Sequence, residues 1–392
     1  MIRQMARGFG AATVALLSVA WSVSTPAAQS LPRGTIIDDV KCAADPTQSY
    51  ALYLPSTYSP DRLWNLLIGF HPAARGRLIV EKYQAAAEQY GYIVAGSNTS
   101  RNGPWPVSVA AVQATSADLG QRFSIDKERL YLTGHSGGAR VAMQVALGRN
   151  NIAGVIASSA GYPDSQPRTS VPFAVFATAG TEDFNYIEMR MLDRKLTSPH
   201  ALAIFLGGHT LPPDAVAFEA IEWMELQAMK SGRRSRDAAL IDRLFEKRQQ
   251  AMASSTSPAA AVQLLGALVA DFTGLRDVSA EAGRLKDLQK QPDVRKALAR
   301  ERADDDAETR MLQEVFELEA ELTDERRHAA ALMRLRDRLS TWARAANAAE
   351  ESTERSRARR ALRVVTSGAA ERVRDREYQA LLDQFRQTGR SR

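Results

Sequence analysis

The feature that most constrains this 392-residue chain is the segment of residues 129–141, which reads RLYLTGHSGGARV. Apolar residues 130–132 predict a buried strand, and small and apolar residues 139–147 predict a helix. Between them, Ser136 stands in the pattern Gly-His-Ser-Gly-Gly. Glycines two positions before and after the serine are needed in a sharp strand-to-helix turn, because a Cβ there would clash with the neighbouring strand or helix. The segment therefore predicts a nucleophile elbow that presents Ser136, with an ordinary strand-to-helix turn as the alternative.

The elbow lies in a region, residues 49–230, where strand-like and helical segments alternate. Besides the elbow strand, we expect strands at residues 50–54, 65–70, 92–97, 153–158, 173–178 and 202–206. Besides the elbow helix, we expect helices at residues 82–90, 107–123 and 186–196, and one that Asp214 caps and that ends near Gly232. This alternation predicts an α/β fold with a mostly parallel sheet covered on both faces, in the order of a compact α/β hydrolase.

Two polar turns follow later strands of this series and carry Asp183 and His209. Active residues of such folds lie just past the carboxyl ends of strands, so Ser136, Asp183 and His209 are expected to meet as nucleophile, acid and base. The three are needed together because a histidine must take the serine proton and a carboxylate must fix and stabilise the imidazole. Glu182 and Asp164 remain alternatives for the acid.

A serine nucleophile also needs amides that hold the developing oxyanion. The amide of Gly137, directly after the nucleophile, is expected to be one donor. The other is expected from the loop that begins at His71. Because Pro72 has no N–H, Ala73 is the candidate there, with Ala74 second, and His71 is expected to brace the loop. We expect neither a metal site nor a cofactor.

The substrate side of the site is expected to be open. Few residues separate the strand that ends at Ser158 from the one that starts at Phe173, so the fold is expected to be lidless. An open pocket favours a bulky or polymer-attached ester. Arg101 and Trp105 follow a strand on the active side and are candidate contacts for an acidic or aromatic substrate group, with a plain surface loop as the alternative.

Together these segments resemble the secreted α/β hydrolases of the polyhydroxybutyrate depolymerase and feruloyl esterase type. The resemblance covers residues 45–230 and is carried by YALYLP at residues 50–55, the His71-Pro72 loop, the elbow and the turns of Asp183 and His209. It implies a serine esterase, although those enzymes usually carry His-Gly where this chain has His-Pro. A serine peptidase of the prolyl oligopeptidase type is the enzymatic alternative, and a catalytically silent hydrolase fold that serves as a binding platform is the alternative from another class.

The N-terminus has the pattern of a secretory signal. Arg3 and Arg7 precede an uncharged apolar run at residues 9–23, which is shorter than the ~20 residues of a membrane span, and small residues follow. We therefore expect residues 1–28 to be a signal peptide and the protein to be exported, to the periplasm or outside the cell. The single cysteine, Cys42, excludes an intramolecular disulfide.

The chain changes character after Gly232, where strand patterns end. Residues 294–367 contain neither glycine nor proline, and apolar residues recur at helical spacing. We expect a hydrolase domain at residues 29–232 and a helical domain at residues 233–392, in which residues 285–292 faintly resemble a tetratricopeptide-type helix pair. The helices carry no catalytic pattern and are expected to pack on the hydrolase, on another protein or on another subunit. The net charge of +6 comes from interleaved charges, which argues against a nucleic-acid surface.

Overall fold

The computed structural model of the protein describes residues 31–164, 168–253, 257–386 and 388. The expected signal peptide, residues 1–28, lies outside the described residues. Contacts divide the chain into two units, Met1–Pro32 and Arg33–Arg392, and all elements below belong to the second.

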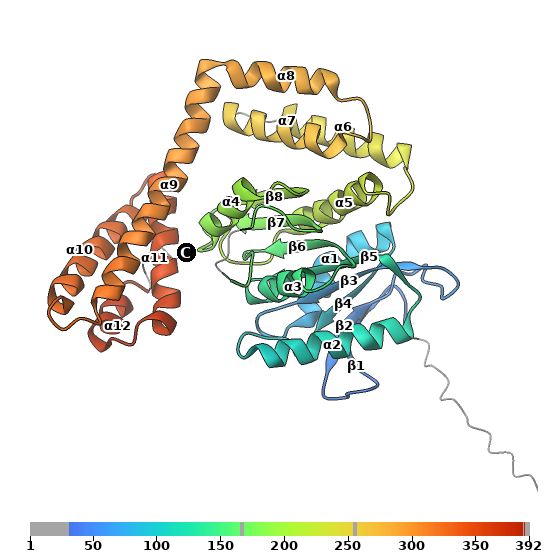
Figure 1. Cartoon of the computed structure of the whole chain (residues 1–392), viewed down its shortest axis with the longest axis horizontal. Helices are drawn as coiled ribbons and strands as arrows, with labels where there is room; N and C mark the ends of the chain where they lie inside the picture. The colour runs from blue at the N-terminus through green and yellow to red at the C-terminus, as the bar shows by residue number, and fades with distance from the viewer. Residues whose placement is uncertain (1–30, 165–167, 254–256, 387, 389–392) are drawn as a thin grey trace, which may run out of the picture. The chain divides into compact units, whose positions relative to one another are not determined.

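Eight strands form one sheet, and only one of them runs against the others (Figure 1). The spatial order is β1-β2-β4-β3-β5-β6-β7-β8; β2 is antiparallel to both of its neighbours, and all other pairs are parallel. The strands are β1 (Ile36–Lys41), β2 (Ser49–Tyr53), β3 (Trp64–Phe70), β4 (Tyr92–Ser97), β5 (Ile125–His135), β6 (Ile152–Ser158), β7 (Ala174–Gly180) and β8 (His200–Phe205).

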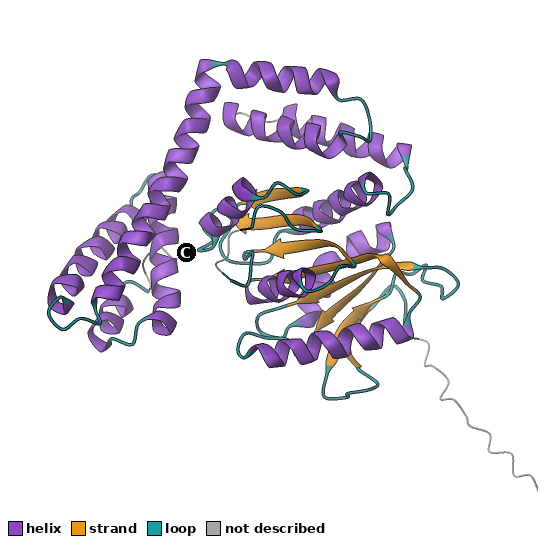
Figure 2. Cartoon of the chain, in the orientation of Figure 1, coloured by secondary structure: helices purple, strands orange, loops and turns teal. Residues whose placement is uncertain are grey.

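Five helices alternate with these strands, and helices alone follow β8 (Figure 2). The first five are α1 (Gly76–Tyr90), α2 (Trp105–Arg122), α3 (Gly137–Leu147), α4 (Tyr186–Lys195) and α5 (Asp214–Lys230). The later ones are α6 (Ala238–Ala253), α7 (Pro258–Phe272), α8 (Ser279–Lys290), α9 (Pro292–Glu321), α10 (His328–Ala346), α11 (Thr353–Arg372) and α12 (Arg376–Asp383).

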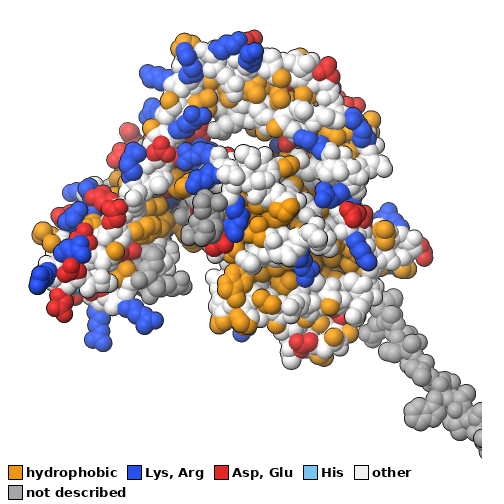
Figure 3. All heavy atoms as spheres, in the orientation of Figure 1, with side chains coloured by type: hydrophobic (Ala, Val, Ile, Leu, Met, Phe, Trp, Pro, Cys, Tyr) orange, Lys and Arg blue, Asp and Glu red, His pale blue; other side chains and the backbone are white. Residues whose placement is uncertain are grey.

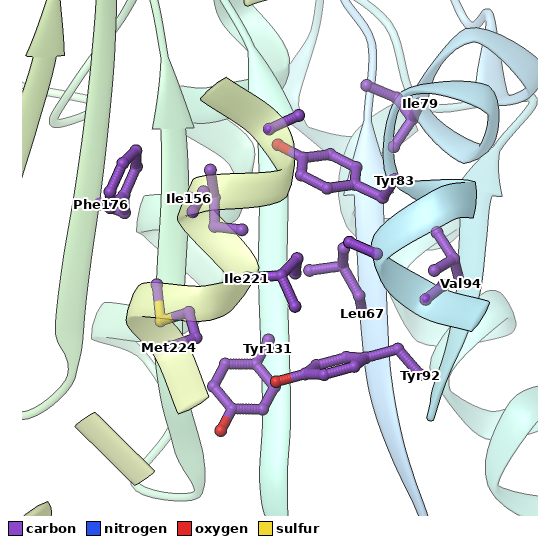
Figure 4. Packing of buried hydrophobic residues seen from close by; sticks show 14 of the residues in the cluster. Leu67, Ile79, Tyr83, Tyr92, Val94, Tyr131, Ile156, Phe176, Ile221 and Met224 are labelled. Carbon is purple, nitrogen blue, oxygen red and sulfur yellow. The ribbon is translucent and has the colours of Figure 1, made fainter. Parts of the chain in front are cut away.

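The main core lies between the sheet and the helices α1 and α5, as Figure 4 shows. Leu67 of β3 and Tyr131 of β5 point to this face, where they pack with Ile221 of α5. Successive strand residues point to opposite faces, so Ile68 and Leu132 face the other side, where they line a cavity of about 400 Å³ with residues of α2. Burying one Leu or Ile side chain completely contributes about 2 kcal/mol to the free energy of folding. The helices that cover both faces of the sheet remove these side chains from water.

Three details differ from the sequence-based expectation. The strand β1 was not expected, because it is an edge strand in which only Val40 is buried. The helix α1 begins at Gly76, well before residue 82, since Ile79 and Val80 already pack into the core. Asp214 is the first helical residue of α5 and not its cap, which is Pro213.

The helices after β8 bury two separate apolar clusters. The first joins α6 and α7 to α5, whose Leu226 and Met229 pack with Leu244 and Phe272. The second lies within α9–α12 and contains Leu335, Trp342, Leu362 and Tyr378, among others. On the face seen in Figure 3, charged side chains of both signs are interspersed over these helices.

The expected boundary at Gly232 is crossed by several polar contacts. The indole of Trp223 on α5 donates to the buried carboxylate of Asp271 on α7 at 2.7 Å, and Lys230 donates to the Ala270 carbonyl at 2.6 Å. Helices α6 and α7 therefore pack on the last helix of the α/β region, and the division into residues 29–232 and 233–392 stays a prediction.

Candidate active site

The turn that carries Ser136 is a single residue long. The strand β5 ends at His135 and α3 begins at Gly137, so Ser136 alone makes the turn, with φ 53°. A Cβ on Gly134 would lie 2.3 Å from the Gly138 carbonyl carbon, and one on Gly138 would lie 2.1 Å from the Phe70 carbonyl oxygen. Both approaches are far inside van der Waals contact, which is why only glycine fits at these positions.

Three side chains from three strand ends form a continuous relay. The Ser136 hydroxyl lies 2.9 Å from His209 Nε2, and His209 Nδ1 lies 2.7 Å from Asp183 Oδ1. Asp183 follows β7, His209 follows β8, and parallel neighbours bring the two loops together. Asp183 is fully buried, whereas the His209 ring keeps a fifth of its surface exposed. The geometry suits a neutral imidazole that donates to the carboxylate and accepts from the serine.

The other candidate acids lie elsewhere. Glu182 pairs with Arg359 and Arg363 of α11, and Asp164 pairs with Arg168. Of the three carboxylates, the structure brings Asp183 to His209.

Additional contacts fix Asp183 and His209. Asp183 Oδ1 also accepts from the amide of Asn185 at 2.8 Å, and the Phe184 ring stacks on the His209 ring at 3.8 Å between centroids. Within the described part of the chain, Asp183 Oδ2 has no hydrogen-bond partner. A carboxylate excluded from water in this way interacts strongly with an imidazolium beside it.

The loop from which an oxyanion donor is expected, at residues 71–74, is hydrogen-bonded internally. Ala73 donates its amide to His71 Nδ1 at 3.1 Å, and Ala74, at φ 56°, donates to the His71 carbonyl at 3.0 Å. Thus His71 braces this loop, and the Ala73 amide must exchange that bond to serve an oxyanion. The Gly137 amide lies at the N-terminus of α3, where helical N–H groups have no intrahelical acceptor.

The loop before α2 approaches Gly137, the residue after Ser136, through Asn102, which the sequence did not single out. Asn102 donates its backbone N–H to the Pro72 carbonyl at 2.9 Å, and its side-chain Oδ1 lies 1.8 Å from where a Cβ on Gly137 would stand. Arg101 forms an isolated β-bridge with Ala73, and Trp105 is 45% exposed at the start of α2. No sequence motif marks Asn102, because its position beside Gly137 results from a contact between two loops that are separate in the sequence.

Three of the five histidines gather at this site. The His135 ring lies 4.9 Å from the His209 ring and 6.0 Å from the His71 ring, between centroids. Burial is the main cause that lowers the pKa of His135, to about 3, and the positive charge that His209 and His71 can carry lowers it further. Burial and the charge of Arg75 also lower the pKa of His71. His135 is therefore neutral at physiological pH and does not compete for the proton of the relay.

The low pKa of His135 predicts a pH effect on stability. Below the usual histidine pKa of about 6.5 the unfolded chain binds a proton that the folded chain excludes, so stability falls as pH falls. Between about pH 6 and pH 4, the free energy of unfolding of the wild type should fall by on the order of 1 kcal/mol per pH unit more than that of His135→Phe. Urea unfolding measures this difference, and parallel curves for the two proteins would contradict it.

No described helix is long and apolar enough to cross a membrane. Among the described side chains, no group of three or more His, Cys, Asp or Glu is arranged to hold a metal ion.

The sheet order, the single antiparallel strand β2 and the sharp Ser136 turn between β5 and α3 define the α/β-hydrolase fold, which confirms the predicted fold class. No protein-family model matches the chain, and no curated protein matches it.

Among solved structures, the chain is similar to several esterases. For a feruloyl esterase module from Clostridium thermocellum complexed with sinapinate, the identity is 14% and the TM-score 0.38, over 48% of this chain and 85% of that one. For esterase B from Lactobacillus rhamnosis, the identity is 14% and the TM-score 0.42, over 51% and 87%. For a thermostable esterase, the identity is 19% and the TM-score 0.35, over 49% and 62%. At such identities, the likeness concerns the fold alone.

Proposed function

We propose that the protein is a serine hydrolase that cleaves carboxylic esters through an acyl-enzyme on Ser136. The observation that carries this proposal is the relay from Ser136 Oγ to His209 at 2.9 Å and on to the buried Asp183 at 2.7 Å. A relay of this kind at a strained turn is the arrangement that makes a serine hydroxyl nucleophilic.

The proposed reaction uses these atoms in the following order. Ser136 Oγ attacks the ester carbonyl while His209 Nε2 takes its proton, and Asp183 stabilises the imidazolium. The amides of Gly137 and Ala73 hold the oxyanion. The imidazolium returns the proton to the leaving alcohol, and the acyl group stays on Ser136. Water then attacks the acyl-enzyme with His209 as base, which releases the acid and restores the serine.

An ester with a bulky or polymer-attached group fits the surroundings of this relay best. Between β6 and β7, the described residues contain no helix that would form a cap. Arg101, which forms the bridge with Ala73, and Trp105, at the start of α2, are exposed and are the candidate contacts for an acidic or aromatic substrate group. The expected signal peptide adds the proposal that the enzyme acts after export, in the periplasm or outside the cell.

A substrate panel tests the proposal. We expect the purified full-length protein to hydrolyse p-nitrophenyl or feruloyl esters, and to cleave short peptides far more slowly, because an amide nitrogen is a poorer leaving group than an alkoxide or phenoxide. Faster turnover of peptides would favour the peptidase alternative. No turnover of any member of the panel would favour a silent hydrolase fold.

A further inference from the structure

We propose that α11 positions the catalytic acid: Arg359, Arg360 and Arg363 hold the loop that carries Asp183, so the helical region takes part in the geometry of the active site. This inference rests on the proposed function, because it assigns the helices a role in the same relay. We call these three side chains the arginine clamp.

The clamp contacts the two residues that precede Asp183. Arg363 donates to the Glu182 carbonyl at 2.9 Å and to the Glu182 carboxylate at 3.2 Å. Arg359 donates to the other oxygen of that carboxylate at 2.7 Å, and Arg360 donates to the Thr181 carbonyl at 2.7 Å. Two consecutive carbonyls and one carboxylate of the acid loop are thus bound by one face of one helix.

The clamp is itself fixed by the helical region. Arg360 donates through Nε and Nη2 to the carboxylate of the buried Glu308 on α9. Its guanidinium also lies 4.2 Å from the centre of the Tyr186 ring, which belongs to α4 of the α/β region. Arg359 donates through Nε to the Ala346 carbonyl at the end of α10. Both arginines are less than 10% exposed. Bidentate, buried guanidinium groups have little freedom, so they transmit the position of α9–α11 to the loop.

The opposite side of the acid loop is bound to the loop of the catalytic base. Thr181 donates its amide to the Phe205 carbonyl and Glu182 donates to the Gly207 carbonyl, both at 2.8 Å. Gly208, next to His209, lies close to the Arg363 guanidinium, since a Cβ there would be 3.3 Å from Nη1. The amide side of the acid loop is therefore fixed by the His209 loop, and its carbonyl side by α11.

This arrangement matters because the relay depends on distance. The Asp183 to His209 bond is 2.7 Å long, and a shift of about 1 Å in a catalytic group can cost on the order of 10²-fold in rate. Without the clamp, two carbonyls and a carboxylate would exchange their guanidinium partners for water, and the loop would sample positions in which Asp183 no longer orients the imidazole. The expected loss is in turnover and not in the binding of a small ester.

The test uses the full chain with Arg363→Ala and Arg359→Ala, together with the conservative Arg363→Lys. We expect each alanine variant to lower kcat for a small ester by about 10- to 100-fold at an unchanged KM. Arg363→Lys should recover part of the loss, because an ammonium group can hold the Glu182 carbonyl or carboxylate but lacks the planar fork that spans both. Arg338→Ala is the matched control: it removes an ion pair with Glu314 between α10 and α9 and should leave kcat unchanged.

Melting temperatures and a second readout separate a positioning role from a merely structural one. The proton shared by His209 Nδ1 and Asp183 should give a downfield proton NMR signal in the wild type and in Arg338→Ala, and this signal should broaden or vanish in Arg363→Ala and Arg359→Ala. If both alanine variants keep the signal and a kcat within twofold of the wild type, or lose only melting temperature, the clamp proposal is wrong. An inactive wild type would instead refute the proposed function, and the NMR signal would still test the clamp.

Discussion

Ser136→Ala is expected to lower kcat for ester hydrolysis by about 10⁶-fold, which is the loss typical of removing the nucleophile from such a relay. The reason is that, among the described residues, Ser136 supplies the hydroxyl that is hydrogen-bonded to His209 Nε2, at 2.9 Å, from a turn in which its φ is 53°. Initial rates on a p-nitrophenyl ester, with enzyme concentration high enough to detect the residual rate, measure the effect.

The matched control is Ser124→Ala. Ser124 directly precedes β5 at its far end and donates to the Pro60 carbonyl at 2.7 Å, so its loss removes one hydrogen bond without touching the relay. Its kcat should equal that of the wild type. If Ser136→Ala keeps full activity while folding normally, Ser136 is not the nucleophile.

Asp183→Asn is expected to lower kcat by about 10⁴-fold, because an amide in place of the carboxylate favours the wrong imidazole tautomer and no longer stabilises the imidazolium. The carboxylate oxygen that accepts from His209 also accepts from the Asn185 amide, so the asparagine can keep its place while losing its charge. Rates on the same ester, with circular dichroism as a check of folding, measure the effect.

Glu182→Gln is the comparison that distinguishes the two neighbouring acids. Glu182 accepts from Arg359 through one carboxylate oxygen and from Arg363 through the other, and a glutamine keeps one of these two acceptors. Arg363 also donates to the Glu182 backbone carbonyl, which the substitution leaves in place, so the loss of activity in Glu182→Gln should be far smaller than in Asp183→Asn. The opposite ranking, with Glu182→Gln the more damaging change, would assign the role of the acid to Glu182.

Much of the α/β region is predictable from local patterns. The parallel strands are short apolar runs bounded by turn residues, and each expected one overlaps a strand of the structure, from β3 to β8. The strand β1 escaped prediction because an edge strand with one buried residue carries no run of apolar side chains. The early start of α1 escaped it because residues 76–81 lie next to a proline loop whose turn signals dominate the local pattern.

In the proposed site, too, the residues marked by a local pattern were predictable and the residues placed by long-range contacts were not. Ser136, Asp183 and His209 are marked by glycine-rich turns at strand ends, and a parallel sheet brings such turns together whatever the details of packing. Asn102 and the arginine clamp do not lie in a glycine-rich turn at the end of a strand. Their positions depend on contacts between segments far apart in the chain, and Arg363 lies 181 residues from its partner Glu182.

The sequence predicts that the region after Gly232 is helical, but it does not predict how these helices pack on the α/β region. Absence of glycine and proline, with apolar residues at helical spacing, indicates amphipathic helices, and α9–α11 have that character. Which face each helix buries depends on its partners. Leu226 and Met229 of α5 pack with α6 and α7, a contact that no pattern on either side of Gly232 reveals.

The central claim, an acyl-enzyme on Ser136, is tested most directly by mapping the site of reaction with a fluorophosphonate, which phosphonylates an activated serine and releases fluoride. We predict one adduct per chain, located by mass spectrometry on the peptide that contains Ser136, with no adduct on protein denatured before treatment and none in Ser136→Ala. An adduct on another residue of the folded protein, or none at all under conditions where the ester is hydrolysed, would contradict the account.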